Sequence, residues 1–297
     1  MLSASAQFGS AAYTWAPRQS QASLHCSRLL RIFAAQNMNM ENKLEILITN
    51  DDGIASKGLH VLAGMMAGYG NVTVVAPKNA QSGKSAAISL DTALYLTEES
   101  KSDGIRMFSF NGTPVDCVKI AVNELFADRM PDILVSGINH GSNCSVAALY
   151  SGTLGACIEG TLYEIPSIGL SVNDHGPEPD FSAVLKYGRI IIDRFIENRL
   201  PKHVYLNVNF PALPDTGIKG IRFAKRGYGR WVKEFTKEKD ADGKDCFRMS
   251  GQFENLEATV GNADHMLMHN GYISIVPHSV DTTDYNALDC LQSDWKL

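Results

Sequence analysis

The chain has 297 residues, of which 44% are hydrophobic and 20% charged, and its formal net charge is −5. This length can bury one large core or two smaller ones. The acidic balance argues against a nucleic-acid-binding surface, and the longest apolar runs fall short of the about 18 residues that suggest a membrane span. The six cysteines show no CxxC pair and no zinc spacing, so we expect reduced thiols in a cytoplasmic protein.

Residues 1–40 differ in composition from the rest of the chain. They contain no Asp or Glu, three arginines and many Ala, Ser and Gln residues. Such acid-poor tails occur in organelle transit peptides. The alternative, which we favour, is a disordered leader or a mis-assigned start, with the true start at Met38 or Met40. We therefore expect residues 41–297 to form the functional domain.

The apolar pattern from residue 43 to about residue 200 predicts alternating strands and helices. In chain order we expect a strand at 44–49, a helix at 56–68, a strand at 71–76, a hairpin of strands 93–97 and 105–110, a helix at 115–126, a strand at 133–135, a Gly- and Asn-rich loop at 137–145, a helix at 152–163, a strand at 167–172 and a helix at 181–198. The opening strand–helix–strand unit favours a parallel sheet with helices on both of its faces.

The pattern changes after residue 200. Strands are expected at 203–210, 220–227 and 271–277, with a charged stretch at 236–246 between them and a helix at 283–295. The sequence therefore predicts an α/β core over residues 43–200, followed by a smaller β-rich part over residues 201–297 that ends in a helix.

Two adjacent acids, Asp51 and Asp52, stand just beyond the end of the first predicted strand, after Asn50, in the segment ILITNDDGI. In open α/β sheets, ligands bind beyond the carboxyl ends of the strands. Two carboxylates so close together repel each other unless a cation lies between them, and divalent ions such as Mg²⁺ prefer oxygen ligands. This pattern favours a metal site, whereas the alternative is an exposed Asp-Gly turn.

Three further polar loops follow or precede other predicted elements, at residues 81–83, 136–143 and 150–153. Their Asn, Ser and Thr side chains and Gly amides suit phosphate oxygens and a hard metal ion. A helix that begins near residue 152 would favour an anion further. Each loop alone is ordinary turn chemistry, so the shared location at strand ends carries the prediction.

Other motifs fit the sequence less well. The segment SGKS at 82–85 resembles the end of a P-loop, but Lys78 stands where that motif needs Gly, and residues 86–96 are expected to form a strand. Haloacid-dehalogenase-like phosphatases need a second acid two residues after the first, where this chain has Gly53. His265 and His269 lack the Glu of a zinc motif and suggest a surface or packing role. A regulatory module that binds a nucleotide without turnover stays open.

Several segments together resemble the SurE survival-protein family. They are ITNDDGI (48–54), VVAPKNAQSG (74–83), NGTPVDCV (111–118), PDILVSGINHGSN (131–143), YSGTLGACIEG (150–160) and, more loosely, GYISIVPHSVDTT (271–283). The resemblance implies a Rossmann-like core and a divalent-metal-dependent phosphatase for nucleoside monophosphates, a 5′-nucleotidase. Whether its activity extends to 3′-nucleotides and polyphosphate stays open. The resemblance also implies Mg²⁺ or Mn²⁺ as cofactor and a homodimer or homotetramer with exchanged C-terminal segments.

The family motifs also imply roles for particular residues. By motif match, the metal ligands are Asp51, Asp52, Ser82 and Asn139, and the substrate phosphate is bound by Asn139, Asn143, Ser151, Gly152 and Thr153. The two acids are the catalytic residues, because the metal ion lowers the pKa of a bound water. Which of the two acids serves as general base stays open.

Overall fold

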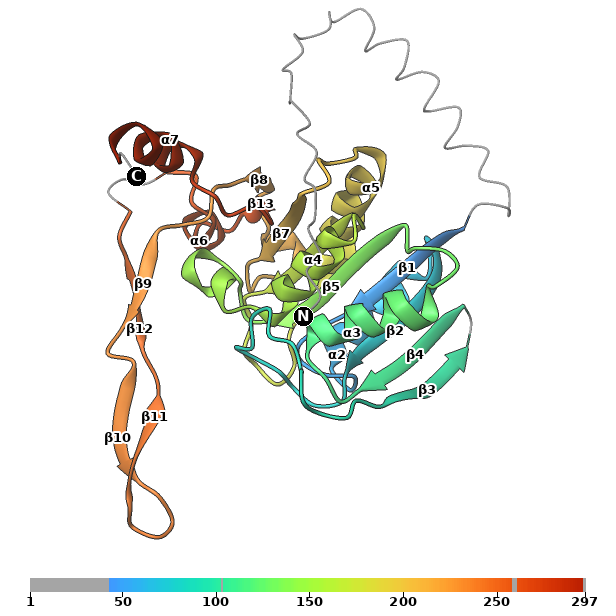
Figure 1. The fold of residues 1–297 in the computed structure, drawn as a ribbon, viewed down its shortest axis with the longest axis horizontal. Coiled ribbons are helices and arrows are strands. Elements are labelled where there is room, and N and C mark those ends of the chain that lie inside the picture. Colours follow the sequence, from blue (N-terminus) through green and yellow to red (C-terminus); the bar gives the residue numbers. More distant parts are fainter. Residues whose placement is uncertain (1–42, 103, 258–260, 296–297) are drawn as a thin grey trace, which may run out of the picture. The chain divides into compact units, whose positions relative to one another are not determined.

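The computed structural model describes residues 43–102, 104–257 and 261–295. The predicted leader at residues 1–40 lies outside these ranges. Leu44–Leu297 form one compact unit, which is drawn in Figure 1.

A nine-stranded sheet forms the centre of this unit, in the order β3-β4-β2-β1-β5-β6-β7-β13-β8. Its strands are β1 (Leu44–Thr49), β2 (Gly70–Pro77), β3 (Leu96–Ser102), β4 (Ile105–Phe110), β5 (Ile133–His140), β6 (Ser167–Val172), β7 (Val204–Phe210), β8 (Ile221–Phe223) and β13 (Ile273–Ser279). The strands from β4 to β7 are parallel, whereas β3 and β13 run antiparallel to β4 and β7. The carboxyl ends of β1, β5, β6 and β7 therefore lie along one side of the sheet, which we call its carboxyl edge.

Helices cover both faces of the sheet (Figure 1). One face carries α2 (Lys57–Met66), the π-helical turn η3 (Val184–Gly188) and α5 (Arg189–Glu197); the other carries α3 (Pro114–Ile120), the π-helical turn η1 (Ala121–Leu125) and α4 (Gly152–Leu162). Successive β1 residues point to opposite faces, so Ile46 and Ile48 join the first core cluster and Leu47 the second. The result is a three-layer α/β/α arrangement.

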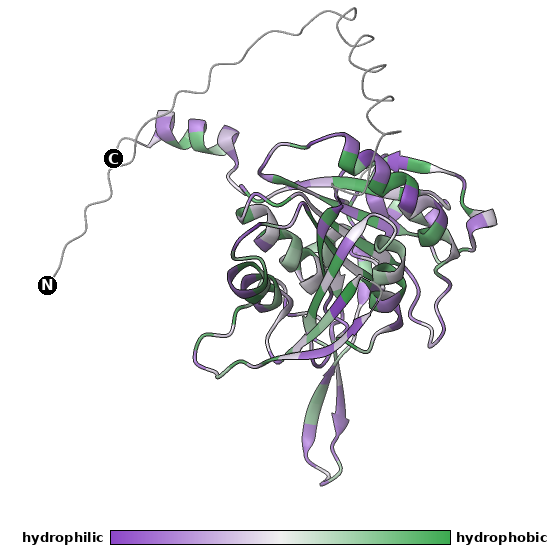
Figure 2. Ribbon diagram, turned by 90° about the vertical axis from the view of Figure 1, so that its right-hand side faces the viewer, coloured by the Kyte–Doolittle hydropathy of each residue, from purple (hydrophilic) through white to green (hydrophobic). Residues whose placement is uncertain are grey.

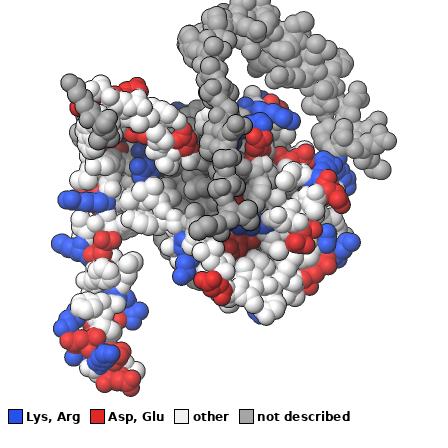
Figure 3. Space-filling model, viewed as in Figure 1, with Lys and Arg blue, Asp and Glu red and all other residues white. Residues whose placement is uncertain are grey.

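The C-terminal part adds two antiparallel pairs and two helices. The pairs are β9 (Gly229–Val232) with β12 (Gln252–Asn255) and β10 (Phe235–Lys239) with β11 (Asp245–Met249); the helices are α6 (Asp264–His269) and α7 (Tyr285–Asp294). Two short 3₁₀ turns, η2 (Ser145–Leu149) and η4 (Asp215–Gly217), complete the elements. The hairpin of β10 and β11 extends away from the sheet (Figure 2), and positive and negative side chains alternate along it (Figure 3).

The predicted fold class is confirmed, including the mostly parallel sheet, the β-rich C-terminal part and the terminal helix. Three local predictions were wrong. Residues 86–95 form no strand, and the strand expected at 220–227 is limited to Ile221–Phe223. The charged stretch at 236–246, for which no element was predicted, contributes to a β-hairpin. The strand predicted at 133–135 continues to His140, because Asn139 and His140 pair with β6. Cross-strand pairing thus overrides the turn preference of the Gly and Asn residues there.

No helix in the described part of the chain is both long and apolar enough to cross a membrane.

Candidate metal and phosphate site

The turn after β1 is shaped by Asn50, a fully buried side chain. Its Nδ2 donates to the Gly53 carbonyl at 3.1 Å and to Ser56 Oγ at 2.8 Å, and its Oδ1 accepts from the Gly53 N–H at 3.3 Å. Gly53 has a φ of +97°, a conformation that favours glycine. Ser56 also caps α2. The turn therefore fixes Asp51 and Asp52 at the carboxyl edge of the sheet.

Asp51 is buried against the start of α4. Thr153 Oγ1 donates to Asp51 Oδ1 at 2.5 Å. A Cβ added at Gly152 would lie 2.7 Å from the Asp51 Cβ, so only glycine permits this approach. Burial raises the pKa of Asp51 to about 6, the negative charge of Asp52 adds to the effect, and the Thr153 hydrogen bonds partly offset it. An ionised Asp51 is thus costly unless a positive charge compensates it.

Asp52 is half-buried beside Asp51. Its Oδ2 accepts from the His140 backbone N–H at 3.2 Å, which ties the turn after β1 to the end of β5. Burial raises the pKa of Asp52 as well, and the His140 N–H opposes that shift. Both carboxylates therefore prefer a partner cation, for the same physical reason.

The two neutral residues predicted as metal ligands lie at the same edge. Asn139 is near the end of β5, and its Nδ2 donates to the Gly141 carbonyl at 2.6 Å, which leaves its amide oxygen available. Ser82 is exposed and follows Gln81, whose N–H donates to the Asp51 carbonyl at 2.7 Å. The structure thus brings the segments that carry the four predicted ligands to the end of β1.

The donor set at this edge fits a hard divalent cation. It consists of two carboxylates, one amide oxygen and one hydroxyl. Among the residues that the structure describes, no group of three or more His, Cys, Asp or Glu side chains is placed to hold a metal ion. Oxygen donors with two negative charges suit Mg²⁺ or Mn²⁺ better than softer metals.

The phosphate-site residues predicted at 151–153 form the start of α4. Ser151 is its N-cap, and its Oγ accepts from the Leu154 N–H at 3.1 Å. The first N–H groups of a helix have no partner within that helix and carry a partial positive charge. Gly152 and Thr153 therefore present a favourable environment for an anion directly beside Asp51.

Asn143 differs from the other predicted phosphate ligands, because hydrogen bonds to neighbouring strands already occupy most of its polar groups. Its Nδ2 donates to Ser171 Oγ at 2.9 Å, and its backbone N–H donates to Asn209 Oδ1 at 2.7 Å. Its carbonyl accepts from Asn207 Nδ2 at 2.8 Å. In this structure Asn143 braces the turn between β5 and η2.

Sequence reasoning missed these two asparagines of β7. Asn207 and Asn209 are fully buried, and Asn209 Nδ2 donates to Asn207 Oδ1 at 2.9 Å. They sit two residues apart on one face of an apolar strand. Alternating Asn residues within the segment YLNVNF were the available signal, because buried amides need hydrogen-bonding partners.

Asp264 is a third residue that the sequence did not reveal. Its fully buried carboxylate accepts from the N–H groups of Ser145 at 2.9 Å, Gly227 at 2.9 Å and His265 at 2.7 Å. Ser145 Oγ also donates to the Gly227 carbonyl at 3.0 Å. Asp264 therefore fastens the start of α6 to the turn that carries Asn143.

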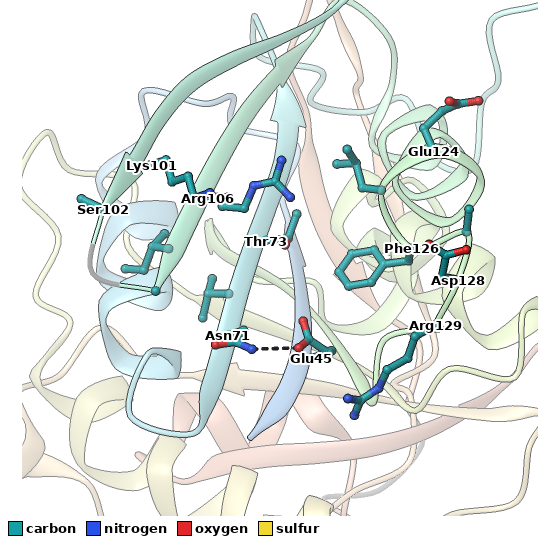
Figure 4. A pocket seen from close by; sticks show the side chains of 15 residues that line it. Glu45, Asn71, Thr73, Lys101, Ser102, Arg106, Glu124, Phe126, Asp128 and Arg129 are labelled. Carbon is teal, nitrogen blue, oxygen red and sulfur yellow. Dashed lines mark hydrogen bonds between the residues drawn. The ribbon is translucent and has the colours of Figure 1, made fainter. Parts of the chain in front are cut away.

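A hollow of about 740 Å³ lies at the opposite edge, near the amino ends of β1, β2 and β4 (Figure 4). It is lined by charges of both signs, among them Glu45, Arg106 and Arg129. Glu45 accepts from Asn71 Nδ2 at 2.8 Å, and Arg129 binds Asp132 at 2.8 Å. The hollow also carries the positive charges of Lys101, Arg106 and Arg129, so the carboxyl edge is the better candidate for a cation site.

Comparisons with known proteins point in the same direction. A family model described as survival protein SurE matches residues 46–233. Proteins named 5′-nucleotidase SurE from Cytophaga hutchinsonii and Flavobacterium psychrophilum are 42% and 40% identical to the chain, each over 85% of this chain and 97% of the relative. The crystal structure of the SurE protein from Aquifex aeolicus is similar, with a TM-score of 0.71 and 29% identity over 84% of this chain and 98% of that one.

Proposed function

Because the chain belongs to the SurE family, we propose that it is a divalent-metal-dependent 5′-nucleotidase, which hydrolyses nucleoside monophosphates to nucleoside and phosphate. Activity on 3′-nucleotides and polyphosphate is part of the same proposal, since each of these substrates presents a terminal phosphoryl group to the metal ion. The names of its relatives from Cytophaga hutchinsonii and Flavobacterium psychrophilum support the nucleotidase activity.

One observation carries the proposal. Two adjacent carboxylates with raised pKa values lie between the start of α4 and the end of β5. A cation there relieves their repulsion, and the helix start beside it attracts an anion. A site that binds both a cation and an anion suits phosphate-ester hydrolysis.

Each residue has a task in this proposal. Asp51, Asp52, Ser82 and Asn139 hold the metal ion. The Thr153 hydroxyl fixes the orientation of Asp51, and the N–H groups at Gly152 and Thr153 bind the phosphate. A bound Mg²⁺ or Mn²⁺ supplies charge neutralisation and a lowered pKa for water. The neutral Ser82 and Asn139 limit repulsion of an anionic substrate.

A phosphate-release assay tests the proposal. We expect the purified chain to release phosphate from AMP or GMP in Mg²⁺ or Mn²⁺, and excess chelator to stop the reaction. Full activity in chelator would overturn the metal assignment. A phosphorylated aspartate, detected by mass after rapid quenching, would support a covalent mechanism instead. Binding of AMP without any phosphate release would identify a regulatory module.

A further inference from the structure

A cavity of about 550 Å³ lies beside the turn that carries Asn143. Four parts of the chain form its walls: the turn at residues 142–147, the segment after β6 with Asn173 and His175, the base of the hairpin with Trp231 and Phe253, and α6 with His265. None of the phosphate or metal residues assigned above lines it. The cavity is therefore a space separate from the candidate phosphate site.

The cavity is uncharged in composition. Its described lining contains no Lys, Arg, Asp or Glu, but it includes two aromatic side chains, three histidines and the amides of Asn173, Asn255 and Asn270. An anion would need positive charges, which this lining lacks apart from histidine. A neutral, flat ring with polar edges matches aromatic faces and amide groups, which both donate and accept hydrogen bonds.

The aromatic wall is held in place by close packing. The Phe253 ring meets Trp231 edge-on at 5.9 Å and His265 at 5.3 Å between ring centroids. Two glycines permit this packing: a Cβ at Gly227 would lie 2.1 Å from His265 Nδ1, and one at Gly229 would lie 2.3 Å from Phe253 Cζ. Trp231 remains 39% exposed and can offer a ring face.

The segment after β5 connects the cavity with the two acids. His140, whose backbone N–H donates to Asp52 Oδ2, stands two residues before Ser142, and Ser142, Cys144 and Ser145 line the cavity on either side of Asn143. The Asn207 and Asn209 side chains hold Asn143, and Asp264 holds Ser145. A ligand whose phosphate is bound near Asp51 would therefore extend past this turn to reach the cavity.

We propose that this cavity binds the nucleobase of a nucleoside monophosphate, with Trp231 as the aromatic contact. The inference rests on the proposed function, because it places the phosphate of the same ligand beside Asp51 and Asp52. It makes nucleotides better substrates than sugar phosphates that lack a base. Stacking on an aromatic ring tolerates different bases, so we expect modest preference among purines.

The test compares AMP with ribose 5-phosphate, which has the same ester and sugar but no base. In Trp231→Ala, we expect kcat/KM for AMP to fall tenfold or more, mainly through KM, and that for ribose 5-phosphate to fall less than twofold. Phe247→Ala is the matched control, because Phe247 is an exposed aromatic of the same hairpin outside the cavity. It should leave both substrates unchanged, and light scattering should give all variants the same mass.

Three results would overturn the inference: equal losses on both substrates in Trp231→Ala, no loss on AMP, or an AMP-specific loss in Phe247→Ala as well. Calorimetric titration with adenosine separates this inference from the proposed function. Adenosine should bind the wild type and bind Trp231→Ala at least tenfold more weakly. Adenosine binding without hydrolysis of any ester would refute only the proposed function. Hydrolysis of AMP with no adenosine binding would refute only the cavity assignment.

Discussion

At the scale of single residues, the site is defined by one buried acid that its surroundings do not neutralise. Asp51 has one hydroxyl partner, an acidic neighbour and a helix start beside it. Burial destabilises the charged form of Asp51 by more than these contacts stabilise it, so the pKa of Asp51 rises. The same imbalance is the reason that we propose Asp51 as a cation ligand.

The first prediction concerns activity. Asp51→Asn and Asp52→Asn should each lower phosphate release at least 100-fold, about 2.7 kcal/mol, because each removes one charge from the cation site. Ser82→Ala and Asn139→Ala should cost less, since water can replace a neutral ligand. Circular dichroism should show an unchanged fold in all four variants. Wild-type turnover in either Asp→Asn variant would contradict the site assignment.

The second prediction concerns pH. The folded state raises the pKa of Asp51 from 3.8 to about 6, so it holds the proton more tightly than the unfolded chain. In chelator, this group stabilises the fold below about pH 4, and that contribution is lost as pH rises through about 6, by up to about 3 kcal/mol. Asp51→Asn lacks this titrating group, so in chelator it should be more stable than the wild type at pH 7.

Urea unfolding from pH 4 to pH 7.5, in chelator, measures this difference. The wild type and Asp51→Asn must be compared directly, because the pKa shift of His278 changes stability with pH in the opposite direction. Burial lowers the pKa of His278 from 6.5 to about 4, so its contribution to stability is lost as pH falls through this window. It affects both proteins equally. Parallel pH curves for the two proteins would refute the burial argument for Asp51.

At the scale of elements, the turn between β5 and η2 is held by polar groups from distant parts of the chain. Asn207 and Asn209 reach it from β7, and Asp264 reaches it from the start of α6. All three side chains are fully buried. Buried polar groups with satisfied partners fix one arrangement of the backbone, because the alternatives leave them unpaired.

The third prediction follows from this bracing. Asp264→Ala should lower the free energy of unfolding by about 3 kcal/mol or more, because it leaves two buried N–H groups and one part-buried N–H group without their acceptor. Asp264→Asn keeps one oxygen acceptor and should cost less. Asp91→Ala, at an exposed position, is the control and should stay within about 0.5 kcal/mol. Equal stability of Asp264→Ala and Asp91→Ala in urea would show that the turn does not depend on Asp264.

At the scale of the whole molecule, the C-terminal helix is the least integrated element. No residue of α7 is buried. Its apolar side chains Leu288 and Leu291 are 38% and 44% exposed, and Trp295 just beyond it is 63% exposed. An amphipathic helix usually buries its apolar side against another surface. This arrangement supports the proposed homodimer or homotetramer with exchanged C-terminal segments.

The fourth prediction concerns that assembly. Light scattering at micromolar concentration should give the mass of a dimer or tetramer. A chain truncated after residue 283, which lacks α7 and the residues beyond it, should shift toward the monomer. A monomeric full-length chain would rule out the exchange of C-terminal segments.

The fifth prediction concerns residues 1–40. They precede β1, which begins at Leu44, and we expect them to be dispensable. A chain that starts at Met40 should match the full chain in melting temperature and in kcat for AMP. A marked loss in either would assign these residues a part in the fold.

The sequence by itself determined the layered core and the location of the acids. Ile46, Leu47 and Ile48 fill both faces of the sheet, and this alternation is local information. The position of Asp51 and Asp52 just beyond that strand is also local information, because it can be read directly from the sequence. The roles of Ser82, Asn139, Asn143 and the residues at 151–153 came from family motifs, and they stay predictions.

Tertiary structure decided what local pattern could not. Residues 137–140 have turn composition, yet pairing with β6 makes them strand. The charged stretch near residue 240 lacks an apolar face, yet cross-strand pairing and ion pairs such as Lys237 with Asp245 make it a hairpin. Asp264 meets Ser145 across more than a hundred residues of sequence. Such contacts join residues that are far apart in the sequence and that only the fold brings together. A local sequence pattern therefore carries no information about them.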